Sequence, residues 1–176
     1  MIVMDLDPGE GVPWAEVIAA AIEVRERLAA SGLASFVKTS GGKGLHVVAP
    51  LKPGAGWDAV KAFTKQVADS LASDSPDHYV ATITKSKRRG RILIDYLRNG
   101  RGATAVAPYS TRARAGAPVS MPLAWDELGT SLGPAYFTVA NTPTRLANLP
   151  ADPWAEFRRA AVPLPAAEPR SRRRVA

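Results

Sequence analysis

The chain has 176 residues, and 46% of them are hydrophobic, which predicts one domain that buries a core. It contains no cysteine, which excludes a disulfide framework and a zinc–thiolate site. No apolar run approaches the roughly 20 residues of a membrane-spanning helix, and the chain does not open with a signal-peptide pattern. We therefore expect a cytoplasmic protein without a membrane partner.

The net charge is +7, from 23 basic and 16 acidic residues. Basic residues gather between Lys85 and Arg114 and again between Arg170 and Arg174. Such a surface favours a polyanionic partner such as nucleic acid, because binding releases the counterions of the polyanion. A solvated charged surface without a specific partner is the alternative that charge alone leaves open.

The first part of the chain alternates apolar strands with amphipathic helices. Residues 1–7 predict a strand that ends in carboxylates, and apolar residues then repeat at helical spacing from 13 to 30. Residues 33–39 and 45–49 predict two strands, joined by a tight glycine-rich hairpin. A second amphipathic helix is predicted from Trp57 to Leu71.

The second part of the chain gives weaker signals. Arg91–Asp95 predicts a clear strand, whereas residues 79–84 are compatible with either a strand or a helix. Ala103–Tyr109 predicts a further strand. Prolines are dense beyond Pro118, so only short helices are expected there, near residues 125–128, 142–148 and 153–160.

These elements predict an α+β fold with a mixed or antiparallel sheet, flanked by the helices at 13–30 and 57–72. The strands that carry polar residues at their ends should converge on one cleft. We expect one catalytic domain over residues 1–161. Residues 162–176 are rich in proline, alanine and arginine and predict a disordered tail.

Two acidic residues stand at the end of the first strand. Asp5 and Asp7 are separated by one residue, so a strand places both carboxylates on the same face. Asp95 ends another apolar strand. Three carboxylates at strand ends are suited to one or two Mg²⁺ or Mn²⁺ ions, which bridge substrate phosphates. The alternative is structural, because Asp-Pro-Gly at residues 7–9 is a common turn.

A glycine-rich segment, residues 40–46, joins the second and third predicted strands. It does not follow the P-loop pattern, since no helix begins at its lysine. Its glycines allow close approach of the backbone, while Ser40, Lys43 and His46 have the chemistry to contact phosphate or ribose oxygens. The alternative is a plain hairpin whose His46 packs in the sheet.

Four blocks of sequence, taken together, resemble one known family. They are residues 5–11, 35–46, 90–99 and 101–114, and the similarity runs in order from residue 2 to about residue 160. The family is the polymerase domain of bacterial DNA ligase D, within the archaeo-eukaryotic primase superfamily. The resemblance implies a primase-polymerase-like catalytic core.

The resemblance also implies roles for individual residues. Asp5, Asp7 and Asp95 take the positions of the family's catalytic and metal-binding acids, which hold two Mn²⁺ or Mg²⁺ ions. Ser40, Lys43, His46 and Arg112 take the positions of groups that hold the triphosphate and sugar of the incoming nucleotide. The implied activity is the addition of ribonucleotides or deoxyribonucleotides to a DNA 3′ end in non-homologous end joining, at DNA ends or gapped duplexes.

One departure from the family concerns the start of the chain. The family domain has a substantial segment before its first motif, and here Met1 falls within the strand that carries Asp5. We therefore expect weak or no activity from the chain alone, and a ligase domain or a separate N-terminal half as its partner. Two other interpretations stay open: a catalytically inactive fragment that binds DNA or nucleotide, and an inert remnant.

Overall fold

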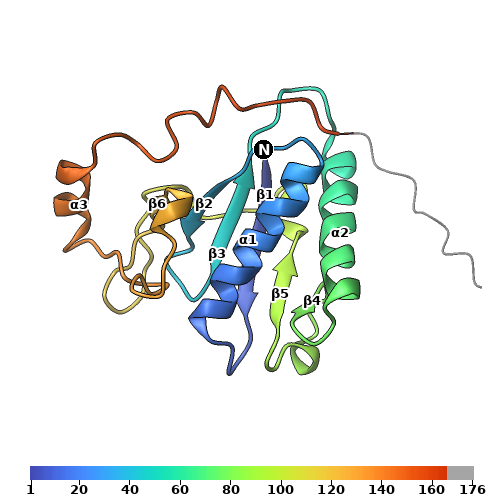
Figure 1. Cartoon of the computed structure of the whole chain (residues 1–176), viewed down its shortest axis with the longest axis horizontal. Coiled ribbons are helices and arrows are strands. Elements are labelled where there is room, and N and C mark those ends of the chain that lie inside the picture. The colour runs from blue at the N-terminus through green and yellow to red at the C-terminus, as the bar shows by residue number, and fades with distance from the viewer. Residues whose placement is uncertain (166–176) are drawn as a thin grey trace, which may run out of the picture.

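A mixed sheet forms the centre of the fold in the computed structural model, which describes residues 1–165. Its six strands lie in the order β4-β5-β1-β3-β2-β6, and two long helices cover one face (Figure 1). The strands are β1 (Ile2–Pro8), β2 (Phe36–Thr39), β3 (Leu45–Ala49), β4 (Tyr79–Val80), β5 (Ile92–Asp95) and β6 (Pro122–Leu123). The helices are α1 (Trp14–Ala30), α2 (Trp57–Asp74) and α3 (Thr142–Asn148), with 3₁₀ turns η1 (Lys85–Lys87), η2 (Leu97–Asn99) and η3 (Trp125–Glu127).

The sheet is mostly antiparallel, because only β4 and β5 pair in parallel. The predicted α+β class is therefore confirmed. None of the helices in the described part of the chain is both long and apolar enough to cross a membrane.

Alternation along β1 gives the sheet one apolar and one polar face. Ile2, Met4 and Leu6 are completely buried in the core, on the side that α1 and α2 cover. Asp5 and Asp7 alternate with Met4 and Leu6 along the strand and therefore project from the opposite face. The helix-covered face of the sheet therefore packs in the core, and the other face carries polar side chains.

Apolar stripes attach the two helices to the sheet. α1 begins directly after Pro13, a residue that suits the start of a helix, and ends before Gly32, whose positive φ of 77° reverses the chain. The buried residues of α1 are Val17, Ile18, Ala20, Ala21, Val24 and Leu28. Those of α2 are Val60, Phe63, Thr64, Val67, Ala68 and Leu71.

The hairpin between β2 and β3 needs its glycines for two separate reasons. Gly41 has a positive φ of 62°, a backbone conformation that residues other than glycine rarely adopt. Gly44 packs against β1, where a Cβ atom would lie 1.9 Å from the carbonyl oxygen of Leu6. The hairpin is therefore held directly against the strand that carries Asp5 and Asp7.

The prediction of a strand over Ala103–Tyr109 is wrong. These residues form an irregular segment that belongs to no strand, and most of them are exposed. The four inner strands β5, β1, β3 and β2 each have a partner on both sides, so none of them offers this segment a free edge. The sequence analysis also missed β6, a strand of only two residues that pairs with β2.

The C-terminal predictions need two corrections. Residues 153–160 form a series of turns rather than a helix. The chain is also ordered past the predicted boundary at residue 162, because Val162 forms a bridge with Leu51 and its carbonyl accepts the Lys52 N–H at 2.9 Å. Apolar contact with the core explains this, since Val162 and Leu164 both pack against it. The rest of the predicted tail, residues 166–176, lies outside the described residues.

Candidate active site

The three predicted acids lie on the polar face of two neighbouring strands. Asp5 of β1 is the direct cross-strand partner of Asp95 of β5. Asp7 follows two residues later on β1, and its partner on β5 is Leu93. The antiparallel register thus brings together two acids that stand 90 residues apart in the sequence, and the third lies next to them on the same face.

Arg98 connects two of these acids. Its Nε lies 3.2 Å from Asp5 Oδ2 and 3.4 Å from Asp95 Oδ2. The neighbouring residue, buried Asn99, fixes this turn against β1, because its side chain accepts from the Val3 N–H and donates to the Val3 carbonyl, both at 2.8 Å. The short turn η2 therefore holds a guanidinium over the pair of acids.

Asp7 has different cationic neighbours. It forms a hydrogen-bonded ion pair with Arg88, and Lys43 Nζ lies 3.8 Å from its Oδ1. Lys43 also donates to the carbonyl oxygen of Pro8 at 3.3 Å. The side chain of Lys43 is 65% exposed, so it is held only loosely at the rim of the site.

The acids have the chemistry of a divalent metal site. Three carboxylates on one sheet face supply the oxygen donors that Mg²⁺ and Mn²⁺ prefer. Residues 1–165 contain no group of three acidic or histidine side chains already arranged to hold a metal ion. Arg98 and Arg88 instead neutralise the carboxylates. The donor set therefore fits a divalent ion, whose binding would compete with these two arginines.

His46 faces the same acids from the other side of β1. It is the cross-strand partner of Asp5, and its Nε2 lies 3.4 Å from Asp5 Oδ1. Its other ring nitrogen, Nδ1, lies 3.1 Å from Nζ of Lys38. The structure thus places His46 on the polar face beside the acids, and only 3% of it is exposed.

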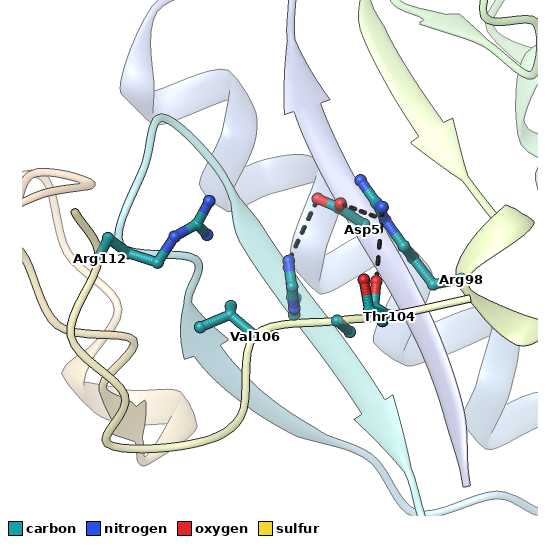
Figure 2. A pocket seen from close by; sticks show the side chains of 7 residues that line it. Asp5, Arg98, Thr104, Val106 and Arg112 are labelled. Atoms are coloured by element: carbon teal, nitrogen blue, oxygen red, sulfur yellow. Dashed lines mark hydrogen bonds and ion pairs between the residues drawn. The ribbon is translucent and has the colours of Figure 1, made fainter. Parts of the chain in front are cut away.

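A pocket of about 380 Å³ opens over Asp5 and His46 (Figure 2). Arg98 and Arg112 stand on opposite sides of it, and Thr104, Ala105 and Val106 form its outer wall. A second lobe of about 220 Å³ shares Asp5, His46, Arg98 and Arg112 with the first. The additional lining residues of this lobe include Asp7, Ser40, Lys43 and Arg114. Acids and cations therefore meet in one continuous cleft.

Arg112 is hydrogen-bonded to the glycine-rich hairpin. Its Nη1 donates to the carbonyl oxygen of Ser40 at 2.9 Å. The hydroxyl of Ser40 in turn accepts the N–H of Gly44 at 3.3 Å. The cleft thus gathers six of the seven predicted site residues in its lining, whereas Asp95 lies beneath Arg98 and lines neither lobe.

Charge and burial give the acids different proton affinities. Burial acts to raise the pKa of Asp5, but the hydrogen bond and attraction from His46 and the charge of Arg98 outweigh it and hold that pKa below its usual value. Burial raises the pKa of Asp95 above its usual value, although the N–H of Leu97 and the charge of Arg98 oppose the rise. Asp5 is therefore the better stabilised anion of the pair.

Sequence reasoning missed three features of the site. Arg88 and Arg98 lie in the basic stretch between Lys85 and Arg114, whose pattern does not predict that they pair with the acids. Lys38 was not singled out, although alternation along a strand places it on the face of its partner His46. The outer wall at residues 104–106 lies within a predicted strand, and no sequence pattern marks it as part of a pocket.

Comparison with known proteins gives a consistent result. The family model described as "LigD, primase-polymerase domain" matches residues 1–154. The multifunctional non-homologous end joining protein LigD of Pseudomonas aeruginosa is 42% identical over 156 residues, which are 88% of this chain and 19% of that protein. The bifunctional non-homologous end joining protein LigD of Bacillus subtilis is 34% identical over 139 residues, 78% of this chain and 23% of that protein. The chain thus spans about a fifth of the length of these relatives.

A solved structure shares the fold. The polymerase domain from Mycobacterium tuberculosis ligase D, in complex with DNA, superposes with a TM-score of 0.81 at 36% sequence identity. The match covers 91% of this chain and 55% of that one. The sheet and helices described above are therefore the fold of about half of that domain.

Proposed function

Because this chain belongs to the LigD primase-polymerase domain family, we propose that it is a metal-dependent nucleotidyltransferase. It adds ribonucleotides or deoxyribonucleotides to the 3′ end of DNA during non-homologous end joining. Its substrates are a nucleoside triphosphate and a DNA end or gapped duplex, and a ligase domain is its expected partner.

The observation that carries this proposal is that acidic and cationic side chains meet in one cleft. The acids Asp5, Asp7 and Asp95 gather on β1 and β5. Cationic and hydrogen-bonding groups face them from the hairpin and from Arg112. Carboxylates beside a basic pocket suit a substrate that arrives as an anionic phosphate and needs a divalent ion.

The role of each residue follows from the chemistry of its side chain. The three acids would hold two Mn²⁺ or Mg²⁺ ions, which supply activation of the 3′-hydroxyl and charge stabilisation at the leaving pyrophosphate. Ser40, Lys43 and His46 orient the triphosphate and the sugar. Arg112 neutralises triphosphate charge from the opposite wall of the pocket.

Primer extension tests the proposal. The purified chain is incubated with a gapped duplex, nucleoside triphosphates and Mn²⁺, and extension of the 3′ end is measured. Asp5→Asn should abolish extension, because it removes a metal-binding charge without a change in side-chain volume. Asp77→Asn changes an exposed aspartate outside the cleft and is the matched control. Equal extension by the wild type and Asp5→Asn would refute the metal-dependent reaction.

A second candidate function is a DNA- or nucleotide-binding fragment with weak or no catalysis. It is favoured by the ion pairs of Arg88 and Arg98 with the acids, because these pairs engage the carboxylates that a metal ion would need. This candidate predicts that the chain binds a gapped duplex in a gel-shift assay but does not extend it at any Mn²⁺ concentration. Extension by the wild-type chain alone would rule it out.

A further inference from the structure

Lys38 is a buried cation directly behind the nucleotide pocket. It lies on the polar face of β2, opposite His46, and is only 2% exposed. Its Nζ lies 2.7 Å from Ser120 Oγ and 3.1 Å from His46 Nδ1. A lysine in this position loses its contacts with water, so hydrogen bonds to the protein have to replace them.

The direction of each hydrogen bond in this cluster can be assigned. The carbonyl oxygen of Thr39 can only accept, so the hydroxyl of Ser120 donates to it, at 2.8 Å. The oxygen of Ser120 therefore accepts from Lys38. The ammonium form of Lys38 carries three N–H groups and no lone pair, so it also donates to His46. Nδ1 of His46 is consequently an acceptor, and its proton must lie on Nε2.

Nε2 is the ring nitrogen that faces the site. It lies 3.4 Å from Asp5 Oδ1, and His46 lines both lobes of the cleft. The hydrogen bonds thus all point in one direction: Lys38 donates to Nδ1 of His46, and Nε2–H of the same ring donates towards the cleft.

We propose that Lys38 is a positioning residue that holds His46 in the Nε2–H tautomer, so that an N–H rather than a lone pair faces the nucleotide pocket. An N–H donates to an anionic phosphate or a sugar oxygen, whereas a lone pair repels it. Lys38 acts through His46 and does not itself line the pocket. The benefit for nucleotide binding rests on the proposed function, but the tautomer of His46 does not.

Nitrogen-15 NMR of the imidazole rings tests the tautomer directly. The full chain has two histidines, so His78→Gln leaves His46 as the only signal. His78 lies outside the cleft, and its side chain is 64% exposed. Below the lowered pKa of Lys38, about 7, where its side chain is an ammonium ion, we expect a protonated Nε2 and an unprotonated Nδ1. A protonated Nδ1, alone or together with Nε2, would overturn the proposal without any further variant.

Substitution of Lys38 then tests the cause. Lys38→Met keeps most of the volume and removes the donor, so both tautomers of His46 should appear. Lys38→Gln restores an N–H donor and should return the spectrum towards the Nε2–H form. Thr64→Val removes a buried hydroxyl on α2, away from the site, and should leave the spectrum unchanged. An unchanged His46 spectrum in folded Lys38→Met would show that Lys38 does not set the tautomer.

Calorimetric titration with ATP and Mn²⁺ links the tautomer to binding. Lys38→Met should bind ATP about tenfold more weakly than the wild type, which is the scale of one lost charge-assisted hydrogen bond. Lys38→Gln should recover most of this loss. If the wild type does not bind ATP while NMR shows the Nε2–H tautomer, the proposed function fails and the positioning role of Lys38 stands.

Discussion

Asp5 and Asp95 are direct cross-strand neighbours, and their carboxylates share a single guanidinium, that of Arg98. Two acids on one half-buried face repel each other unless a cation lies between them. In the described structure Arg98 supplies that cation. A divalent ion would neutralise the same two carboxylates, so the arginine and the metal compete for them.

This competition predicts that Arg98→Gln binds Mn²⁺ more tightly than the wild type, by about tenfold, because one positive charge beside the acids is lost. The metal-free variant should also melt at a lower temperature and regain stability when Mn²⁺ is added. Titration with Mn²⁺, followed through the spin resonance of the free ion, measures the affinity. Arg101→Gln, an exposed arginine that lines neither lobe, is the control. Equal affinity in wild type and Arg98→Gln would contradict the competition.

The burial of Lys38 predicts an unusual dependence of the free energy of unfolding on pH. Burial lowers the pKa of Lys38 from 10.5 to about 7, with a smaller lowering from Arg112 and an opposing effect from Asp5. Between these values the unfolded chain holds a proton that the folded chain has released, so the free energy of unfolding rises with pH in this window. One proton contributes at most about 1.4 kcal/mol per pH unit.

Lys38→Met should lack this rise, which denaturant unfolding at several pH values within the window would measure. The matched control is Lys61→Met, an exposed lysine on α2, which should keep the slope of the wild type. The measurement stays below pH 10.0, because Tyr109 begins to ionise there in the unfolded chain, whereas burial raises its pKa to about 12 in the folded chain. A slope that survives in Lys38→Met would show that Lys38 keeps an ordinary pKa in the folded chain.

The ion pair between Glu127 and Arg145 predicts sensitivity to acid. Arg145 donates to both carboxylate oxygens, at 2.7 and 2.9 Å, and the N–H of Ala124 adds a third hydrogen bond at 2.7 Å. Burial acts to raise the pKa of Glu127, but these partners hold it below 4.5. The stabilisation is complete above the unfolded pKa of 4.5 and is lost as pH falls through the lowered folded pKa.

Glu127→Gln should therefore lower the free energy of unfolding by about 1–2 kcal/mol at neutral pH and flatten its decline in acid. Chemical denaturation at neutral and acidic pH measures both effects. Glu26→Gln, on the exposed side of α1, should change neither. A variant Glu127→Gln with the acid profile of the wild type would mean that this carboxylate is not stabilised by folding.

The contact between the hairpin and β1 predicts that Gly44→Ala destabilises the fold, by about 3 kcal/mol. Its Cβ would lie 1.9 Å from the carbonyl oxygen of Leu6, so the hairpin or the strand has to move. Gly100→Ala is the control, because its nearest neighbour would be 3.7 Å away and its φ of −99° suits alanine. Thermal unfolding compares the two. Similar melting temperatures for both variants would indicate that the hairpin is not held against β1.

Local periodicity was enough to predict the elements that build the core. The strand at 45–49 and the helix at 142–148 have the predicted bounds, and the helices α1 and α2 differ from prediction only at their ends. Each is long or regular enough for its own pattern to show. The two residues of β6 are too few for any period, and residues 103–109 resemble a strand although the sheet has no free edge there.

The candidate site was predictable to the extent that it follows from alternation along strands. Asp5 and Asp7 share a face for that reason, Asp95 ends a second apolar strand, and the family resemblance added Arg112. The pairing of Asp5 with Asp95 depends on long-range register, which local sequence does not contain. Lysine is usually exposed, so the burial of Lys38 appears only once Ser120 and β6 cover β2. The catalytic and binding roles of these residues stay predictions.

The cleft has one wall inside the sheet and one wall outside it. Asp5, His46 and Asp95 stand on strands that are bonded on both sides, whereas residues 104–106 belong to no strand. Substitutions in this outer segment leave the hydrogen bonds between the strands intact, whereas substitutions on the strands disturb them. During evolution, residues 104–106 can therefore change the shape of the cleft while the residues that the strands hold stay in place.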